Sequence, residues 1–314
     1  MDSATLAKFG LCDEDFERRV CPVCGDQTER EAFHVGDRDG VGLQTVVCRS
    51  CGALFTDPAP TPEALHRFYS ESYRTHYVGD PEVDRRRIRV SYRHFRPWLP
   101  RTGRLLELGA HDGSFLDLVG RSHPEVERLA VDPDRRSRPA DDTIRWFDGL
   151  DDAVLSEGPP VDAIVSLHVV EHLRDPAEVL DACRLLLAPG GLLMTEVPNL
   201  SRLRQGDGFV HLAHLSHFLP WTFEHLLRRT GFEPVDVWPG RIGRWPGETV
   251  LRIVARRASD VPSEPPTPRG SPSWTVGRDA FLRSVHRRDP VIDWLRRRRW
   301  IVALYARLLR LVRG

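Results

Sequence analysis

The sequence has almost no lysine: Lys8 is the only one among its 45 basic residues, and all the others are arginine. A phosphate-binding Walker A loop needs a Gly-Lys-Ser/Thr sequence, and an enzyme that works through a Schiff base needs a side-chain amine. Both classes of protein are therefore excluded.

Net charge and long apolar runs are absent as well. The 314 residues carry a formal net charge of zero, which argues against a general binder of polyanions. No apolar run approaches the roughly 20 residues that span a bilayer. The acidic first residues lack the apolar core of a secretory signal peptide, so we expect a cytoplasmic protein.

Four of the six cysteines form two Cys-x-x-Cys pairs, each followed by glycine and separated by 23 residues: Cys21, Cys24, Cys48 and Cys51. Two such pairs supply the four thiolates of a tetrahedral zinc site, which leaves no open position for a substrate. Disulfides are the alternative, and a cytoplasmic chain disfavours them. The spacing predicts a structural zinc ion.

An alternation of apolar strands and amphipathic helices begins at Arg104. Strands are predicted at residues 104–109, 128–132, 143–147, 161–169 and 192–197, and helices at 85–99, 114–121, 176–188 and 222–229. Residues 231–239 and 249–257 are expected to pair as a final antiparallel hairpin. Apolar strands joined by helices predict an α/β fold whose sheet is covered on both faces.

A chain of this length exceeds one compact domain. The predicted parts are a zinc-binding module (1–75), a connecting helix (76–101), the α/β domain (102–257), a Pro/Ser-rich linker (258–275) and a basic helical tail (276–314).

A glycine-containing turn follows the first strand of the α/β domain. Gly109 and Gly113 allow close approach of a ligand to the backbone, and Asp132, at the end of the next strand, can accept both hydroxyls of a ribose. His111 stands where the dinucleotide fingerprint needs glycine. The pattern predicts an adenosine-containing ligand without a pyrophosphate. A tight turn with no ligand is the alternative.

Five segments in this order resemble class I S-adenosylmethionine-dependent methyltransferases over residues 102–257: Glu107–Gly113, Val131-Asp132, His168–Pro176, Pro189–Gly191 and Gly231–Glu233. With the four cysteines in front of them, the chain resembles the zinc-containing sugar C-methyltransferases of deoxysugar biosynthesis. The resemblance implies a Rossmann-like sheet of seven strands, with a small N-terminal zinc module and a C-terminal amphipathic helical tail.

The same resemblance implies a cofactor site for S-adenosylmethionine. It places Glu107, Gly109 and Gly113 around the methionine part and Asp132 at the ribose. Asp148 is expected at the adenine, and His168 is expected to line the pocket.

Two groups among the 13 histidines need separate interpretation. His168-x-x-Glu171-His172 matches the order of an inverted zinc protease motif, but it starts at a strand end and fits the methyltransferase pattern, where it shapes the loop below the cofactor.

The second group follows the fifth strand. In the sugar C-methyltransferases this region resembles Glu-His-x-Ser-Tyr-Phe, and His214 matches the histidine that acts as general base, while Ala213 and His217 replace the glutamate and the tyrosine. Without the acidic neighbour, oxygen methylation fits as well as carbon methylation. Alternatively, these histidines only pack. Tyr77, His211 and His217 are predicted to contact the acceptor.

The last residues form a basic amphipathic pattern, with ten arginines against two aspartates from Arg283 onward. Such a helix can lie on an anionic membrane, or dock onto the enzyme or onto a second copy in a homodimer.

We therefore expect methyl transfer to a small-molecule or glycan-type acceptor, such as a sugar or sugar nucleotide. RNA methylation is an alternative, which the neutral charge and the lack of an Asn-Pro-Pro-Tyr motif disfavour. A non-catalytic zinc-ribbon adaptor that keeps a cofactor fold is another.

Overall fold

A seven-stranded sheet forms the centre of the computed structural model, which describes residues 1–77, 81–139, 143–150, 159–202, 209–241, 249–259, 275–276, 278–279 and 281–282. Its strands in spatial order are β12 (Phe232–Arg241), β13 (Thr249–Arg257), β10 (Leu187–Pro198), β9 (Val161–Leu167), β6 (Gly103–Leu108), β7 (Val126–Val131) and β8 (Arg145–Phe147). Strand β13 runs antiparallel to both of its neighbours, β12 and β10, and every other neighbouring pair in this sheet is parallel. The predicted strands and the terminal hairpin are confirmed.

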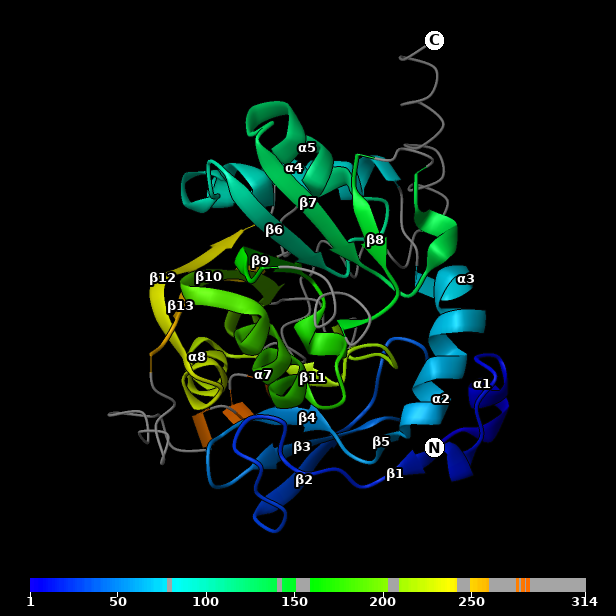
Figure 1. Ribbon diagram of the computed structural model, residues 1–314. Helices are drawn as coiled ribbons and strands as arrows, with labels where there is room; N and C mark the ends of the chain where they lie inside the picture. Colours follow the sequence, from blue (N-terminus) through cyan, green and yellow to red (C-terminus); the bar gives the residue numbers. More distant parts are fainter. Residues whose placement is uncertain are drawn as a thin grey trace, which may run out of the picture.

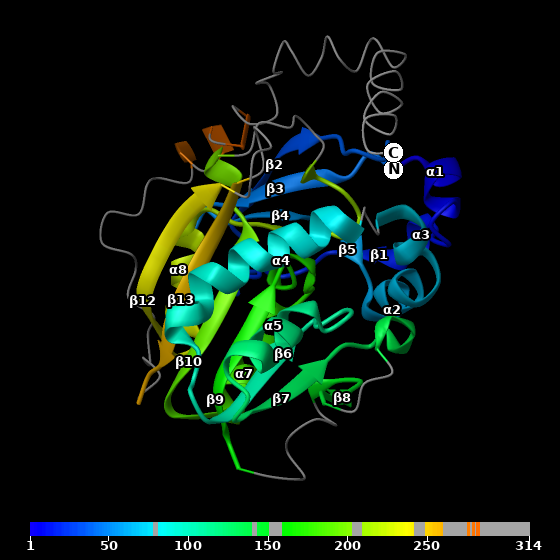
Figure 2. The ribbon, with the colours of Figure 1, turned by 90° about the horizontal axis from the view of Figure 1, so that it is seen from above.

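Helices cover both faces of this sheet (Figures 1 and 2). One face packs against α4 (Pro81–Phe95) and α5 (Ser114–Ser122), the other against α7 (Pro176–Leu186) and α8 (Pro220–Arg229). Alternate residues of one strand serve the two faces: Leu105 lies in the cluster with α5, and Leu106 in the cluster with α7 and α8. This alternation explains why consecutive residues of the strand are apolar.

The N-terminal part builds a second, four-stranded antiparallel sheet below the first in Figure 1. Its order is β11 (Ser216–His217), β4 (Leu54–Thr56), β3 (Gln44–Cys48) and β2 (Arg30–Val35). A shorter ladder joins β1 (Phe16–Glu17) to β5 (Ala59–Pro60), and α1 (Ser3–Ala7) and η1 (Asp13–Asp15) precede it. Because β11 comes from the α/β region, this sheet crosses the predicted domain boundary at residue 75, and the division itself stays a prediction.

The connection between the two sheets is longer than the single helix predicted for it. It consists of α2 (Pro62–Arg67), the π-helix η2 (Phe68–Ser72), α3 (Tyr73–Tyr77), α4 and the 3₁₀-helix η3 (Arg96–Trp98). Helix α4 was predicted at residues 85–99, but it begins at Pro81 and gives way to a 3₁₀ turn at Arg96. Pro97 lacks an amide hydrogen and cannot continue an α-helix.

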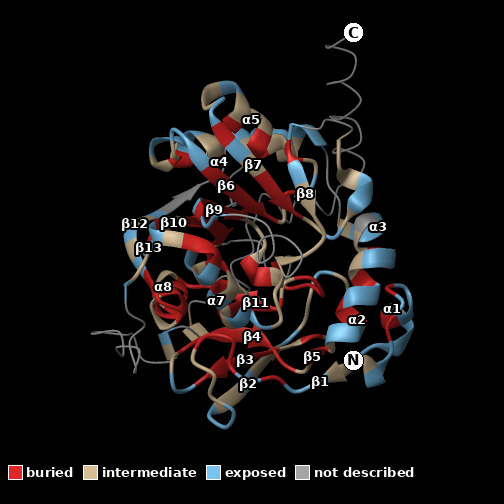
Figure 3. Ribbon diagram, in the orientation of Figure 1, coloured by how far each residue is buried: buried red, intermediate tan, exposed pale blue. Residues whose placement is uncertain are grey.

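The two sheets share one apolar core, which Figure 3 shows as buried segments of β3, β4 and α8. Phe55 of β4 is clustered with Phe223 of α8. In addition, Arg229 at the end of α8 donates from Nη1 to the carbonyl of Val23 at 2.8 Å. The N-terminal part is therefore packed firmly on the face that carries α8.

Only the beginning of the predicted tail is described. Phe281 is fully buried, with its ring edge-on to Phe33 of β2 at 5.1 Å between centroids. Residues 283–314, with the predicted amphipathic helix and its membrane or dimer contacts, and most of the predicted linker lie outside the described residues. Among the described helices, none has the length and apolar character needed to cross a bilayer.

Candidate functional site

The turn after β6 is built around two glycines in the left-handed region. Gly109 has φ 72° and Gly113 has φ 74°. A Cβ at Gly109 would lie 2.3 Å from Cγ2 of Val169, and one at Gly113 would lie 3.0 Å from Cδ1 of Ile144. The backbone therefore packs tightly against Val169, and no larger residue fits at Gly109, whereas the predicted approach of a ligand stays a prediction.

Gly109→Ala is expected to destabilise the protein by about 2–5 kcal/mol, because it adds an overpacked contact to a left-handed backbone. Gly190→Ala is the matched control, since Gly190 has φ 75° and nothing within 4 Å of its Cβ position. That control is expected to cost only about 1–2 kcal/mol. Denaturant unfolding measures both variants, and equal losses would contradict the close contact with Val169.

Three carboxyl groups gather at the ends of β6 and β7. Glu107 is 4% exposed and its Oε2 has no hydrogen-bond partner. Burial raises the pKa of Glu107 well above its usual value, and the nearby Asp112 and Asp132 raise it further. Asp132 accepts the amides of His111 and Asp134, each at 2.8 Å. This edge favours a ligand that offers hydroxyl donors and positive charge, such as the ribose and ammonium groups of S-adenosylmethionine.

Asp148 lies at the same edge but is engaged by arginine. Its Oδ1 accepts Nη2 of Arg138 at 2.5 Å, and Arg135 binds the carboxylate as well. Hydrogen bonds from Arg135 and Arg138 lower the pKa of Asp148 to about 2. The predicted contact with adenine stays a prediction, and it would require the carboxylate to be shared.

His168 follows β9 with a left-handed φ of 55°. Its Nδ1 lies 3.2 Å from Oε1 of Glu171, and its Nε2 lies 3.0 Å from Oε1 of Glu196. Burial lowers the pKa of His168, but the two carboxylates outweigh this and raise it to about 10. Glu196 in turn pairs with the fully buried Arg252. His168 is thus an imidazolium with both nitrogens engaged, and its cofactor contact stays a prediction.

Opposite these strand ends lies a cluster of rings, which we call the tyrosine–histidine cluster: Tyr69, Tyr73, Tyr77, His172, His211 and His214. Tyr77 stacks on His211 at 4.8 Å, and His211 lies 3.8 Å from His214. His172 and His214 are 4.9 Å apart. The structure therefore brings together three of the predicted residues, Tyr77, His211 and His214.

His214 has a defined tautomer. Its Nδ1 lies 2.9 Å from the carbonyl of Phe209, and because a carbonyl only accepts, Nδ1 carries the hydrogen and Nε2 keeps a lone pair. Burial lowers the pKa of His214 well below its usual value, and the neighbouring His211 and His172 act in the same direction. The ring is therefore a neutral acceptor at physiological pH.

His217 lies differently. It pairs with Leu54 across β11 and β4, and its ring packs between Phe209 and Phe281 at 5.6 and 5.9 Å. It is 4% exposed, and burial lowers its pKa to about 3. Packing is its visible role, and acceptor binding stays a prediction.

Two further residues reach this cluster from the N-terminal part. Tyr77 donates its hydroxyl to Oδ2 of Asp39 at 2.5 Å, and the guanidinium of Arg38 lies 4.6 Å from the centre of the Tyr77 ring. Sequence reasoning missed Arg38 and Asp39, because they occupy a loop with no periodic pattern. The loop of residues 38–39 in the N-terminal part therefore packs against the tyrosine–histidine cluster at Tyr77.

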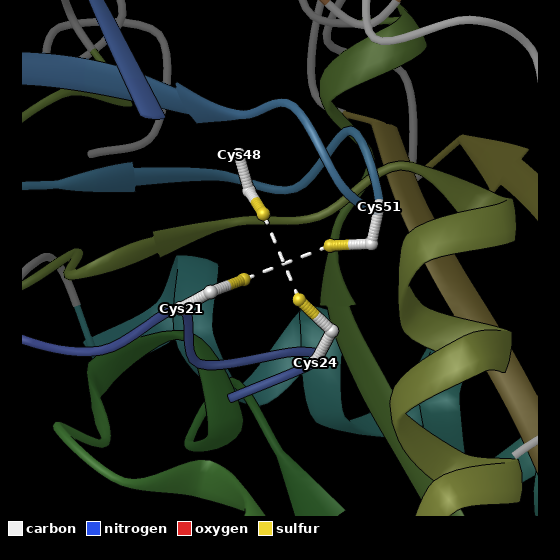
Figure 4. Close-up of side chains that lie close together, drawn as sticks. All are labelled: Cys21, Cys24, Cys48 and Cys51. Carbon is white, nitrogen blue, oxygen red and sulfur yellow. Dashed lines mark hydrogen bonds between the residues drawn. The ribbon is translucent and has the colours of Figure 1, made fainter. Parts of the chain in front are cut away.

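The four paired cysteines converge on one point (Figure 4). Sγ of Cys21 lies 3.6 Å from that of Cys51, and Sγ of Cys24 lies 3.6 Å from that of Cys48. Figure 4 shows these two lines crossing, as opposite edges of a tetrahedron do. Four sulfurs bound to one zinc at about 2.3 Å are about 3.8 Å apart. The donor set and its spacing fit a zinc ion.

Comparison with known proteins agrees with this geometry. A family model described as a methyltransferase domain matches residues 82–237. The chain contains a class I methyltransferase domain. The predicted fold and the resemblance to class I S-adenosylmethionine-dependent methyltransferases are thereby confirmed, whereas the narrower resemblance to sugar C-methyltransferases stays a prediction.

Named relatives match this domain at low identity. The ubiquinone biosynthesis O-methyltransferase of Roseobacter denitrificans is 28% identical over 153 residues, which are 42% of this chain and 61% of the relative. The C-methyltransferase NovU of Streptomyces niveus is 25% identical over 265 residues, or 76% of this chain and 61% of the relative. The chain thus spans about three fifths of the length of either relative.

A solved structure shares the fold. It is the 1,6-didemethyltoxoflavin-N1-methyltransferase of Burkholderia thailandensis, with bound 1,6-didemethyltoxoflavin and S-adenosylhomocysteine. It is 19% identical, with a TM-score of 0.52, and the match covers 73% of this chain and all of that one.

Proposed function

We propose that this protein transfers the methyl group of S-adenosylmethionine to an oxygen or carbon atom of a small acceptor. The supporting observation is that the glycine turn with Asp132 and the tyrosine–histidine cluster meet at one edge of the sheet. Nη2 of Arg136, four residues after Asp132, donates to the carbonyl of Ser70 at 3.1 Å, and the hydroxyl of the adjacent Tyr69 lies 3.1 Å from Nδ1 of His172. Donor and acceptor would therefore lie side by side.

When bound, S-adenosylmethionine supplies a methyl group already activated by its positively charged sulfur. The protein then mainly has to bind and align the two molecules. Asp132 would hold the ribose, and the turn at Gly109 and Gly113 would receive the methionine part. His214 would take a proton from the acceptor through Nε2, because its Nδ1 is held by Phe209.

We propose a sugar or sugar nucleotide as the acceptor. The resemblance of the paired cysteines and the methyltransferase segments to sugar C-methyltransferases supports it, and the match to the C-methyltransferase NovU over 76% of this chain agrees with methyl transfer to carbon. The ubiquinone O-methyltransferases, matched over 42%, point to a different substrate. A labelled-methyl assay that compares nucleotide sugars, ring hydroxyl compounds of ubiquinone biosynthesis and RNA separates these acceptors. Labelling of RNA alone, or of no acceptor, would overturn the proposal in favour of RNA methylation or of a non-catalytic adaptor.

We also propose that the four cysteines hold a structural zinc ion. Four thiolates fill its coordination sphere, so the metal would stabilise the N-terminal sheet rather than bind substrate.

Asp132→Asn is expected to weaken S-adenosylmethionine binding about 10–100-fold, because neutralising the carboxylate removes charge-assisted hydrogen bonds to the ribose. Titration calorimetry measures the affinity. Asp236→Asn is the control. Asp236 lies on β12, an edge strand on the far side of the sheet from β7, which Asp132 follows. Equal affinity of wild type and Asp132→Asn would exclude this aspartate as the ribose ligand.

A further inference from the structure

The proposed methyl transfer uses His214 but neither Glu171 nor His172, and the three side chains come together. One donor atom from each lies within 4.8 Å of the others. Glu171 and His172 belong to η5 (Val170–His172), directly after β9, whereas His214 comes from the segment before β11. Two imidazoles and one carboxylate form a common ligand set for zinc and other divalent transition metals.

Each of the three side chains contacts a partner outside this group of three. His214 donates Nδ1–H to the Phe209 carbonyl, and His172 Nδ1 lies 3.1 Å from the hydroxyl of Tyr69. Oε1 of Glu171 lies 3.2 Å from the His168 ring. Metal-binding histidines and carboxylates characteristically have such partners on their far side, which fix the ring and its tautomer.

On each of the three side chains, the ligand atom that does not contact its partner is left to bind a ligand. Oε2 of Glu171 has no hydrogen-bond partner, although the residue is 1% exposed, and a buried carboxylate oxygen without a partner is costly. The lone pair of His214 is on Nε2, as its tautomer requires. His172 Nε2 lies 3.8 Å from Oε1 of Glu171. A buried carboxylate that keeps one unsatisfied oxygen and has an oxygen within 4.8 Å of both imidazoles is the environment that a cation would complete.

We propose that Glu171, His172 and His214 bind a divalent transition-metal ion of the size of zinc, at a second site separate from the four cysteines. Ligands at about 2.0–2.2 Å from one ion are about 3.4 Å apart, so the side chains would close by about an ångström. Three protein ligands leave a fourth position open.

Metal binding and proton transfer exclude each other at His214, because both use the lone pair on Nε2. The site therefore goes beyond the proposed methyl transfer and does not depend on it. A bound ion blocks the proposed base, so excess Zn²⁺ is expected to inhibit turnover by the wild type.

The test is titration of the zinc-loaded full chain with Co²⁺, without methyl donor or acceptor. One additional Co²⁺ per chain is expected, with an absorption spectrum that lacks thiolate charge transfer, because the ligands are nitrogen and oxygen. Glu171→Gln and His214→Ala are each expected to abolish this binding and to keep the zinc of the four cysteines. Tyr69→Phe, which removes only the partner behind His172, is expected to weaken it about 10–100-fold.

His66→Ala is the control, because His66 is exposed on α2, outside the cluster. It is expected to bind Co²⁺ as the wild type does. Absence of a second Co²⁺ in the wild type, or equal binding by His214→Ala, would overturn the proposal. Since no methyl donor is present, either result leaves the proposed methyl transfer untouched, and an inactive enzyme that binds the second ion leaves the metal site standing.

Discussion

Cys48→Ser is expected to lose the bound zinc ion and to destabilise the protein by at least about 3 kcal/mol. Structural zinc contributes about 10–16 kcal/mol of binding free energy in zinc-finger peptides, and that energy is coupled to folding. Cys48 ends β3, is 1% exposed and belongs to the core cluster that joins the two sheets. Losing the ion leaves three thiols around a gap in that core. Metal analysis and thermal unfolding measure the two effects.

Two other cysteines provide matched controls. Cys183→Ser places the same hydroxyl in a fully buried position of α7, so it reports the cost of the substitution without the metal. Cys12→Ser changes an exposed thiol. Both are expected to retain the zinc ion. If Cys48→Ser kept its zinc, or lost no more stability than Cys183→Ser, the four-cysteine site would not be a structural metal centre.

His214→Ala is expected to lower the rate of methyl transfer by about 10²–10⁴-fold, the usual contribution of a positioned general base. The affinity for S-adenosylmethionine is expected to stay unchanged, since His214 belongs to the tyrosine–histidine cluster and not to the glycine turn that would hold the cofactor. The measurement is labelled-methyl turnover at saturating acceptor without added metal, together with calorimetry of donor binding.

The exposed His66→Ala is again the comparison, and it is expected to turn over at the wild-type rate. Turnover of His214→Ala within a few-fold of wild type would show that the histidine does not abstract the proton. A parallel loss of donor affinity would instead point to a structural effect on the whole site.

Much of the fold could be predicted because it depends on local signals. Strands that contribute to both faces, such as β6 and β9, are mostly apolar, and Asp175-Pro176 marks the start of α7. Gly109 was recognisable because only glycine fits its turn. The end of α7 was less clear: the helix was predicted to reach residue 188, but it ends at Leu186 and β10 begins at Leu187. Hydrophobic periodicity does not resolve such helix ends, because helix boundaries depend on tertiary contacts as well as on sequence.

The site could be predicted only in part. Cys-x-x-Cys spacing is a local pattern, so all four converging cysteines were found. Glu171 and His214 lie 43 positions apart, and only tertiary packing brings them within reach of each other. Arg38 meets Tyr77 through the packing of the N-terminal loop on α3, for which the sequence carries no periodic signal.

The pairing of Ser216 with Phe55 has a consequence for how the chain can be divided. The loop that carries His214 ends in β11, an edge strand of the sheet in which β3 ends at Cys48. Cutting the gene between the two regions would leave that strand without its neighbour and expose the inner face of α8. We therefore expect the N-terminal part and the α/β region to unfold together, and residues 102–257 alone to be less stable than the whole chain.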